Sequence, residues 1–162
     1  MDREIFFKAK RIDNGEWVEG SLLVDEAGNC YIGVYIYPGQ ETDIVVGGRT
    51  NGKTHRRFHG IGFTQVDSNT ICQYTGLTDK NGNKIWENDV VKKHFYTDYD
   101  VFANSEEYVG VVKFIDCAWV VETVREKNKC IRPIFEAMAY SQDVKYFEVI
   151  GNIFDNPELL TE

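Results

Sequence analysis

The sequence is poor in several features that would narrow its class. It holds only 3 prolines in 162 residues, no Cys-x-x-Cys pair, and no apolar run long enough to span a membrane. Its opening residues, Met-Asp-Arg-Glu-Ile, lack the apolar core of a signal peptide. These absences argue against a ribbon-type zinc site and a membrane span, and we expect the protein to stay in the cytoplasm.

The four cysteines are far apart in the chain. Cys30, Cys72, Cys117 and Cys130 follow no metal-binding spacing. Such isolated cysteines are typical of reduced thiols buried in strands of an intracellular protein. We therefore expect free thiols, with a disulfide or a metal site as the less favoured alternative.

Positive charge is also scarce. The chain carries 18 Lys and Arg against 26 Asp and Glu, a formal net charge of −8. The deficit is larger in residues 71–162, with 10 basic and 16 acidic side chains, than in residues 1–70, with 8 and 10. Because an acidic surface repels a phosphate backbone, non-specific nucleic-acid binding is not the default expectation.

Aromatic residues and glycines are abundant. The chain has 10 Phe, 9 Tyr, 3 Trp and 14 Gly, which favour strands and turns over helices. Turn clusters such as Asp13-Asn14-Gly15 and Asp116-Cys117 separate runs that alternate apolar with polar residues. The predicted strands are residues 4–11, 17–24, 30–37, 43–46, 61–66, 70–75, 89–95, 108–115, 118–124 and 146–153. Residues 131–140 favour a strand over a helix, and Asn156 begins a closing helical turn.

Three segments resemble one known family. Residues 71–91, Ile-Cys-Gln-Tyr-Thr-Gly-Leu-Thr-Asp-Lys-Asn-Gly-Asn-Lys-Ile-Trp-Glu-Asn-Asp-Val-Val, are similar to the signature of the YopX family, proteins of phage and prophage genomes. Residues 3–20, with Arg-Glu-Ile-x-Phe-x-Ala and Trp-Val-x-Gly, resemble the opening of that family, and residues 148–160 resemble its closing motif. One departure is Asn88, where the family has Gly. Since Asn tolerates a left-handed backbone, we expect this turn to survive.

The resemblance implies a mainly β protein of unestablished function whose C-terminal half forms a small SH3-like β-barrel. We accordingly expect an N-terminal antiparallel β meander in residues 1–70 and the SH3-like barrel in residues 71–162, with little helix. Residues 73–91 then form a hinge between the halves, in which Tyr74, Leu77, Ile85 and Trp86 are buried.

Residues 47–54, Gly-Gly-Arg-Thr-Asn-Gly-Lys-Thr, satisfy the P-loop pattern. A P-loop also needs a long helix directly after the Lys-Thr pair and a parallel sheet to support it. The following residues contain Gly60 and Gly62 and show no βαβ pattern. We interpret the match as coincidental and expect neither nucleotide binding nor enzymatic activity.

The same region holds the only concentrated positive charge. A solvated loop is the favoured interpretation, and contact with an anion or a partner is the functional one. The residues concerned are Lys53, His55, Arg56, Arg57 and His59. The two histidines would face the same way only on a helix, so no metal site is predicted. Asp79-Lys80-Asn81-Gly82 resembles a calcium loop, but its glycine comes too early, which favours a hairpin.

Aromatic side chains offer a further candidate surface. Trp17, Trp86 and Trp119 could line a binding groove, although burial in a core is the favoured interpretation. Trp17 and Trp86 each follow a glycine turn, which the common grammar of hairpins explains better than an internal repeat.

No catalytic, cofactor or metal residues can be assigned from the sequence. We therefore expect a non-catalytic protein-binding or assembly module in the cytoplasm of a bacterial host, with a host or phage protein as partner. The alternative is a nucleic-acid-associated small β-barrel module that uses the basic loop 53–59. No membrane partner is expected, and self-association stays open.

Overall fold

The computed structural model describes residues 4–35, 44–45, 55–56, 61–93, 108–123, 131–133 and 147–160, and all structural statements concern these residues. The chain divides into two compact units. The first unit is residues 5–73, and the second is residues 74–160 together with Glu4. The sequence placed its boundary after residue 70, so both divisions fall near the start of the stretch that carries the family resemblance.

Most of the described residues lie in strands, and every strand pair among them is antiparallel. The strands are β1 (Phe7–Lys10), β2 (Trp17–Val24), β3 (Cys30–Tyr35), β4 (Ile44–Val45), β5 (His55–Arg56), β6 (Ile61–Val66), β7 (Cys72–Thr78), β8 (Lys84–Trp86), β9 (Asp89–Lys93), β10 (Tyr108–Ile115), β11 (Ala118–Thr123), β12 (Ile131–Pro133) and β13 (Phe147–Asn152). Two single 3-10 turns, η1 (Ser68–Thr70) and η2 (Pro157–Leu160), accompany them. The predicted mainly β class is confirmed.

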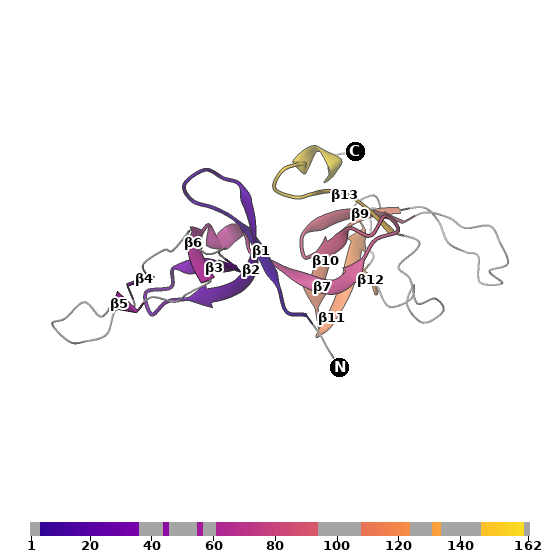
Figure 1. Ribbon diagram of the computed structural model, residues 1–162. Helices are drawn as coiled ribbons and strands as arrows, with labels where there is room; N and C mark the ends of the chain where they lie inside the picture. Colours follow the sequence, from indigo (N-terminus) through magenta and orange to yellow (C-terminus); the bar gives the residue numbers. More distant parts are fainter. Residues whose placement is uncertain are drawn as a thin grey trace. The chain divides into compact units, whose positions relative to one another are not determined.

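The first unit is the predicted meander, with β6, β3, β2 and β1 adjacent in that order (Figure 1). Its sheet curls until its two ends meet. Arg11, just after β1, bridges to Val66 of β6, and the Ile12 amide donates to the Gln65 carbonyl at 3.3 Å. The curled sheet encloses a core built on Ala9, Cys30, Ile32 and Val66. The four strands thus close into a ring around their own apolar face.

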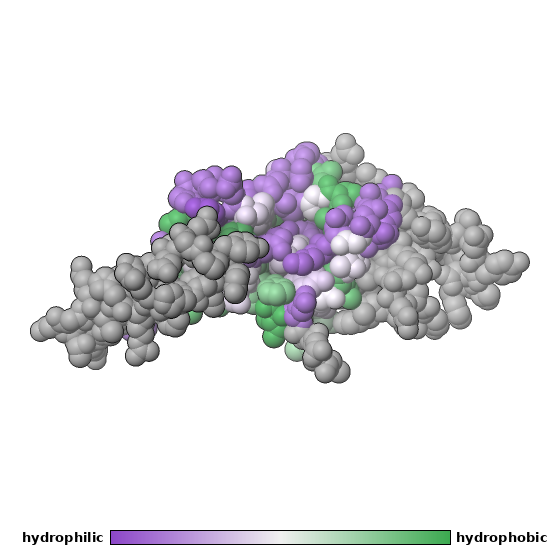
Figure 2. Space-filling model, in the orientation of Figure 1, coloured by the Kyte–Doolittle hydropathy of each residue, from purple (hydrophilic) through white to green (hydrophobic). Residues whose placement is uncertain are grey.

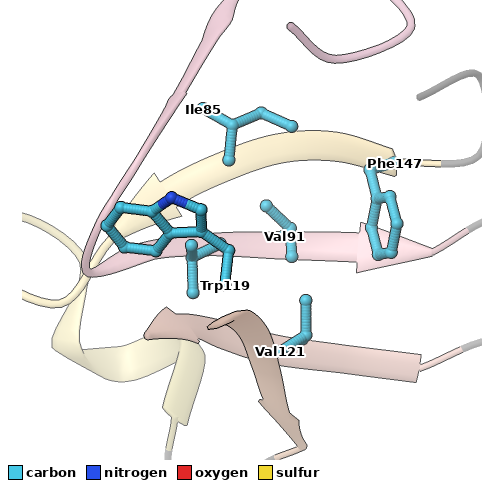
Figure 3. Packing of buried hydrophobic residues seen from close by; sticks show 6 residues of the cluster. Ile85, Val91, Trp119, Val121 and Phe147 are labelled. Atoms are coloured by element: carbon cyan, nitrogen blue, oxygen red, sulfur yellow. The ribbon is translucent and has the colours of Figure 1, made fainter. Parts of the chain in front are cut away.

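The second unit is a five-stranded sheet in the order β12-β11-β10-β9-β13. Its core brings together Ile85, Val91, Val112, Trp119, Val121 and Phe147 (Figure 3). A register shift between Val149 and Gly151 places a bulge in β13, at a residue without a side chain. Among the described residues no backbone pairing joins β12 to β13, so closure into an SH3-like barrel stays a prediction.

Strand β7 belongs to both units in turn. Its first residues, Cys72 and Gln73, pair with β1, and its later residues pair with β8, where Tyr74 faces Trp86. Tyr74, Ile85 and Trp86 are buried as predicted, and Leu77 is partly buried.

Two sequence expectations concern exposure. Cys30 and Cys72 are buried free thiols, as expected, but Cys117 is exposed because it sits at the tip of the β10–β11 hairpin and not inside a strand. Figure 2 shows hydrophilic side chains over much of the described surface, with separate hydrophobic patches between them. No described helix is long and apolar enough to cross a membrane.

Candidate functional site

The basic loop predicted as an anion or partner contact falls largely outside the described residues. Lys53, Arg57 and His59 lie there, as does the whole P-loop-like segment 47–54. His55 and Arg56 form β5, which pairs with Ile44 and Val45 of β4. The described residues therefore do not test the anion-contact prediction or the interpretation of the P-loop match as coincidental, and both stay predictions. In the part of the chain that is described, no three His, Cys, Asp or Glu residues gather as metal ligands.

Asp79, which resembled a calcium ligand, caps a turn. Its buried carboxylate accepts hydrogen bonds from the amides of Asn81 at 2.8 Å and Asn83 at 2.9 Å, and from the Asn83 side chain. It also accepts from the amide of Val149 in β13 at 3.0 Å. Burial raises the pKa of Asp79, but these hydrogen bonds outweigh it and leave the pKa below its ordinary value. The carboxylate therefore fastens the β7–β8 hairpin to β13.

Neighbouring groups strengthen the same attachment. The Lys80 amide donates to the Phe147 carbonyl at 3.0 Å, and the Lys80 ammonium pairs with Glu148 at 2.8 Å. Residues 79–80 come from the signature stretch, whereas residues 147–149 lead into the closing motif. The two segments most similar to the family thus meet in the fold, and the residues that join them stabilise that contact.

Two further turns, one in the signature stretch and one in the closing motif, also stabilise the fold. Asn88 adopts a positive φ of 65°, so the turn survives the Gly-to-Asn departure as predicted. Its amide donates to the Val112 carbonyl at 2.8 Å, and its carbonyl accepts from the Ile153 amide. At the end of the chain the Asn152 side chain accepts from the amides of Phe154 and Asp155, each at 2.9 Å. The strongest sequence signals therefore specify turns.

The tip of the β10–β11 hairpin presents an exposed aromatic side chain. Phe114 is 50% exposed, and its ring centroid lies 4.9 Å from that of Trp119, which is 5% exposed. The two residues are opposite each other in the register, so they share one face of the sheet. Asp116 and Cys117 both have positive φ, as in the tight turns that join hairpins. The Trp119 indole nitrogen is buried without an acceptor among the described residues.

The first unit carries a second aromatic cluster, in which two lysines lie over Trp17 on the outside of the curled sheet. The Lys8 and Lys10 ammonium groups lie 5.1 and 5.5 Å from the centroid of the Trp17 ring. Trp17 is only half-buried, so the prediction of a core position is wrong for Trp17, whereas it is confirmed for Trp86 and Trp119. Trp17 differs because it lies opposite Lys10 of β1, on the face of the sheet that points away from the core.

A polar depression of about 520 Å³ opens at one end of the same unit. The ends of β1 and β6 and the turns at Gly15 and Gly28 surround it. Arg11 lines the depression, but its guanidinium is already paired with Asp13, which raises the Arg11 pKa through that hydrogen bond. Lys10 and Asp67 also line the depression, so charges of both signs meet there and neither sign of ligand is favoured.

Sequence reasoning missed the residues of both aromatic clusters apart from the tryptophans. The alternation Lys8-x-Lys10 was a usable signal, because residues two apart in a strand share a face. Placing Trp17 on that face requires the hairpin register, which the turn at Asn14-Gly15 only suggests. Phe114 gave no signal, because it alternates like a core residue.

Comparison with known proteins agrees with the resemblance. The model of the YopX family, described as YopX protein, matches residues 7–161. No curated protein matches the sequence. A crystal structure of protein EF1440 from Enterococcus faecalis is similar, with a TM-score of 0.53 and 23% identity over 98% of this chain and 99% of that one, which supports the fold alone. With a family match over nearly its whole length, the chain belongs to the YopX family.

Proposed function

We propose that this YopX-family protein is a non-catalytic binding and assembly module of phage or prophage origin, and that its second unit binds a partner protein. The observation that carries the proposal is the hairpin tip, where half-exposed Phe114 rests on buried Trp119. Aromatic anchors of this kind contribute much of the affinity at protein interfaces. The buried indole keeps the outer ring in place, so little side-chain freedom is lost on binding.

Charge indicates the chemistry of the partner. Residues 5–73 hold 7 basic and 8 acidic side chains, a net of −1, which leaves −7 of the total −8 on the rest of the chain. Asp116 adds an exposed carboxylate at the hairpin tip itself. Complementary charge speeds encounter and selects partners. A protein with a basic surface around an apolar pocket therefore suits this tip.

Site-specific photo-crosslinking in bacterial cells tests the proposal. A benzophenone amino acid replaces Phe114, and in a control chain it replaces Val24, a side chain of the first unit with 55% exposure. We expect the first chain, and not the control, to crosslink to one defined protein with a basic surface, identified by mass spectrometry. That partner, once purified, should bind the unmodified chain and shift the indole N–H resonance of Trp119 but not that of Trp17.

The variant Phe114→Ser provides the decisive comparison. Because the Phe114 side chain is half exposed, we expect the variant to fold normally, and thermal unfolding checks this. We expect the purified partner to bind it about tenfold or more weakly, as for an interface anchor. Equal crosslinking from both positions, unchanged affinity of the variant, or crosslinking only to a second copy of this chain would each overturn the proposal.

A further inference from the structure

The outer face of the first unit gathers aromatic and basic side chains by strand register. In an antiparallel pair, residues directly opposite each other share a face. Lys10 lies opposite Trp17, and the pair of buried Ala9 and partly buried Val18 alternates with them on the inner face. Across β2, β3 and β6 the outer face continues through Leu23, opposite Tyr31, and through Gly33, opposite Phe63. We call Lys8, Lys10, Trp17, Tyr31 and Phe63 the aromatic face.

The rings of the aromatic face are accessible and held in place. Trp17, Tyr31 and Phe63 are each half-buried, and Leu23 beside Tyr31 is 45% exposed. The Tyr31 hydroxyl donates to the Asp25 carboxylate at 3.3 Å, which fixes the ring. Gly33 adds no side chain between Ser21 and Phe63, so a flat group can approach the sheet there.

Charge on this face differs from charge on the rest of the protein. The first unit is nearly neutral, whereas the remainder of the chain carries −7. The Lys8 and Lys10 ammonium groups lie over the Trp17 indole. A flat aromatic ligand that stacks on the indole would displace the two ammonium groups, and anions that flank the ligand would attract them. Alternating flat rings and phosphates are the chemistry of single-stranded nucleic acid, which proteins bind by stacking bases and pairing phosphates with lysines. Two carboxylates oppose this: that of Glu19, which lies opposite Lys8, and that of Asp25, which accepts from the Tyr31 hydroxyl.

We propose that the aromatic face binds single-stranded nucleic acid, with bases stacked on Trp17 and on Tyr31 and Phe63, and with phosphates held by Lys8 and Lys10. This site shares no residue with the basic loop 53–59 or with the hairpin tip of the proposed protein-binding function. It needs no base-specific contacts, because stacking tolerates every base.

Fluorescence anisotropy with labelled oligothymidylate and oligouridylate, each of about 16 nucleotides, tests the proposal at several salt concentrations. We expect saturable binding at low salt that weakens as salt rises. The double variant Lys8→Gln, Lys10→Gln should reduce the slope of log K against log salt by roughly 1.4, about 0.7 for each lost phosphate contact. Trp17→Leu should bind about tenfold more weakly through lost stacking. Comparing the two oligonucleotides separates DNA from RNA as the source of the ligand.

Two further variants make the result specific to this face. Glu19→Gln removes the carboxylate that lies opposite Lys8 and should bind more tightly than the natural chain. Lys84→Gln with Lys113→Gln makes the same change in net charge in the second unit, where Lys84 lies over the Tyr74 and Trp86 rings, and should leave the salt slope unchanged. Phe114→Ser should also bind normally, which separates this inference from the proposed protein-binding function.

The opposite results are equally clear. An absence of saturable binding to both oligonucleotides at low salt overturns the inference, as does an equal loss from the two double lysine variants. Binding of duplex DNA as tightly as single strands would show plain charge attraction without stacking. If Trp17→Leu unfolds the first unit, the lysine and glutamate variants, which change charge outside the core, still decide the outcome.

Discussion

The two units contain the same five-residue turn in different surroundings. Asp25 to Asn29 and Asp79 to Asn83 share the pattern Asp-x-x-Gly-Asn, and in both the Asp carboxylate accepts from the amides of the third and fifth residues and from the Asn side chain. The Asp25 carboxylate then reaches only the Tyr31 hydroxyl, at the surface. The Asp79 carboxylate is buried and reaches β13, 70 residues along the chain.

The comparison separates local from tertiary stabilisation. The local hydrogen bonds depend on the five residues alone, so they recur wherever the pattern occurs. Their energetic weight depends on burial, because the hydrogen bonds around buried Asp79 are part-buried, whereas those around Asp25 are exposed and water can replace them. The two units differ in the same way. The resemblance to the family is strongest in the second unit, where a turn such as that of Asp79 hydrogen-bonds to a distant strand.

The first unit can be broken at a single position. A Cβ added to Gly20 would overlap the backbone carbonyl oxygen of Gly33 and touch the Ile32 side chain at 3.0 Å. Backbone cannot move aside without separating β2 from β3, so we expect Gly20→Ala to destabilise the first unit by about 4 kcal/mol. Amide hydrogen exchange should show lost protection at Ile32 and retained protection at Val112. Equal loss at both residues would show that the two units unfold as one.

The matched turns give the next largest effect. Asp79→Ala leaves the part-buried amides of Asn81, Asn83 and Val149 without their acceptor and should destabilise the second unit by about 3 kcal/mol. Asp25→Ala removes the same local hydrogen bonds at the surface and should cost clearly less. Amide hydrogen exchange, followed at Val112 for Asp79→Ala and at Ile32 for Asp25→Ala, measures the loss in the unit that holds each turn. Similar losses would mean that burial does not set the weight of this turn.

Acid should act on the same carboxylate. The pKa of Asp79 is below its ordinary value, so between the two values the unfolded chain binds a proton that the folded chain does not. The contribution of Asp79 to stability is therefore complete above the ordinary carboxyl pKa and is lost as pH falls through the lower, folded value. We expect the natural chain to lose stability between about pH 5 and about pH 2 more steeply than Asp79→Asn, measured by urea midpoints. Parallel curves for the two chains would contradict this assignment.

Most of the fold could be predicted from the sequence because its signals are local. Alternation and turn residues gave β2, β6 and β10 with their observed bounds, and the Asn88 turn followed from the tolerance of Asn for positive φ. Closure of the first unit was not predicted, because the bridge from Arg11 to Val66 joins residues far apart in the chain and leaves no periodic pattern. Pairings of this kind depend on how far the sheet twists and curls.

The candidate surfaces were less predictable for a related reason. Trp17 and Trp119 both look like core residues in the sequence, yet only Trp119 is buried. Register decides the difference, since shifting a strand by one residue moves every side chain to the other face. The basic loop, the clearest local signal of charge, is a prediction that the described residues do not test, whereas Lys8 and Lys10 gain their meaning only from Trp17 across the strand.

The smallest predicted effect is a gain in stability at the hairpin tip of the second unit. Cys117 has a φ of 64°, a left-handed conformation that costs a residue with a Cβ about 1 kcal/mol and costs Gly almost nothing. Cys117→Gly should therefore stabilise the second unit by up to about 0.5 kcal/mol, after allowing for the greater freedom of Gly in the unfolded chain. Cys117→Ser removes the thiol but keeps the Cβ, so it should not stabilise, and a gain in both variants would assign the effect to the thiol. Because Phe114 is only three residues away, a stabilised tip that still binds the partner would also show that the strained turn does not serve recognition.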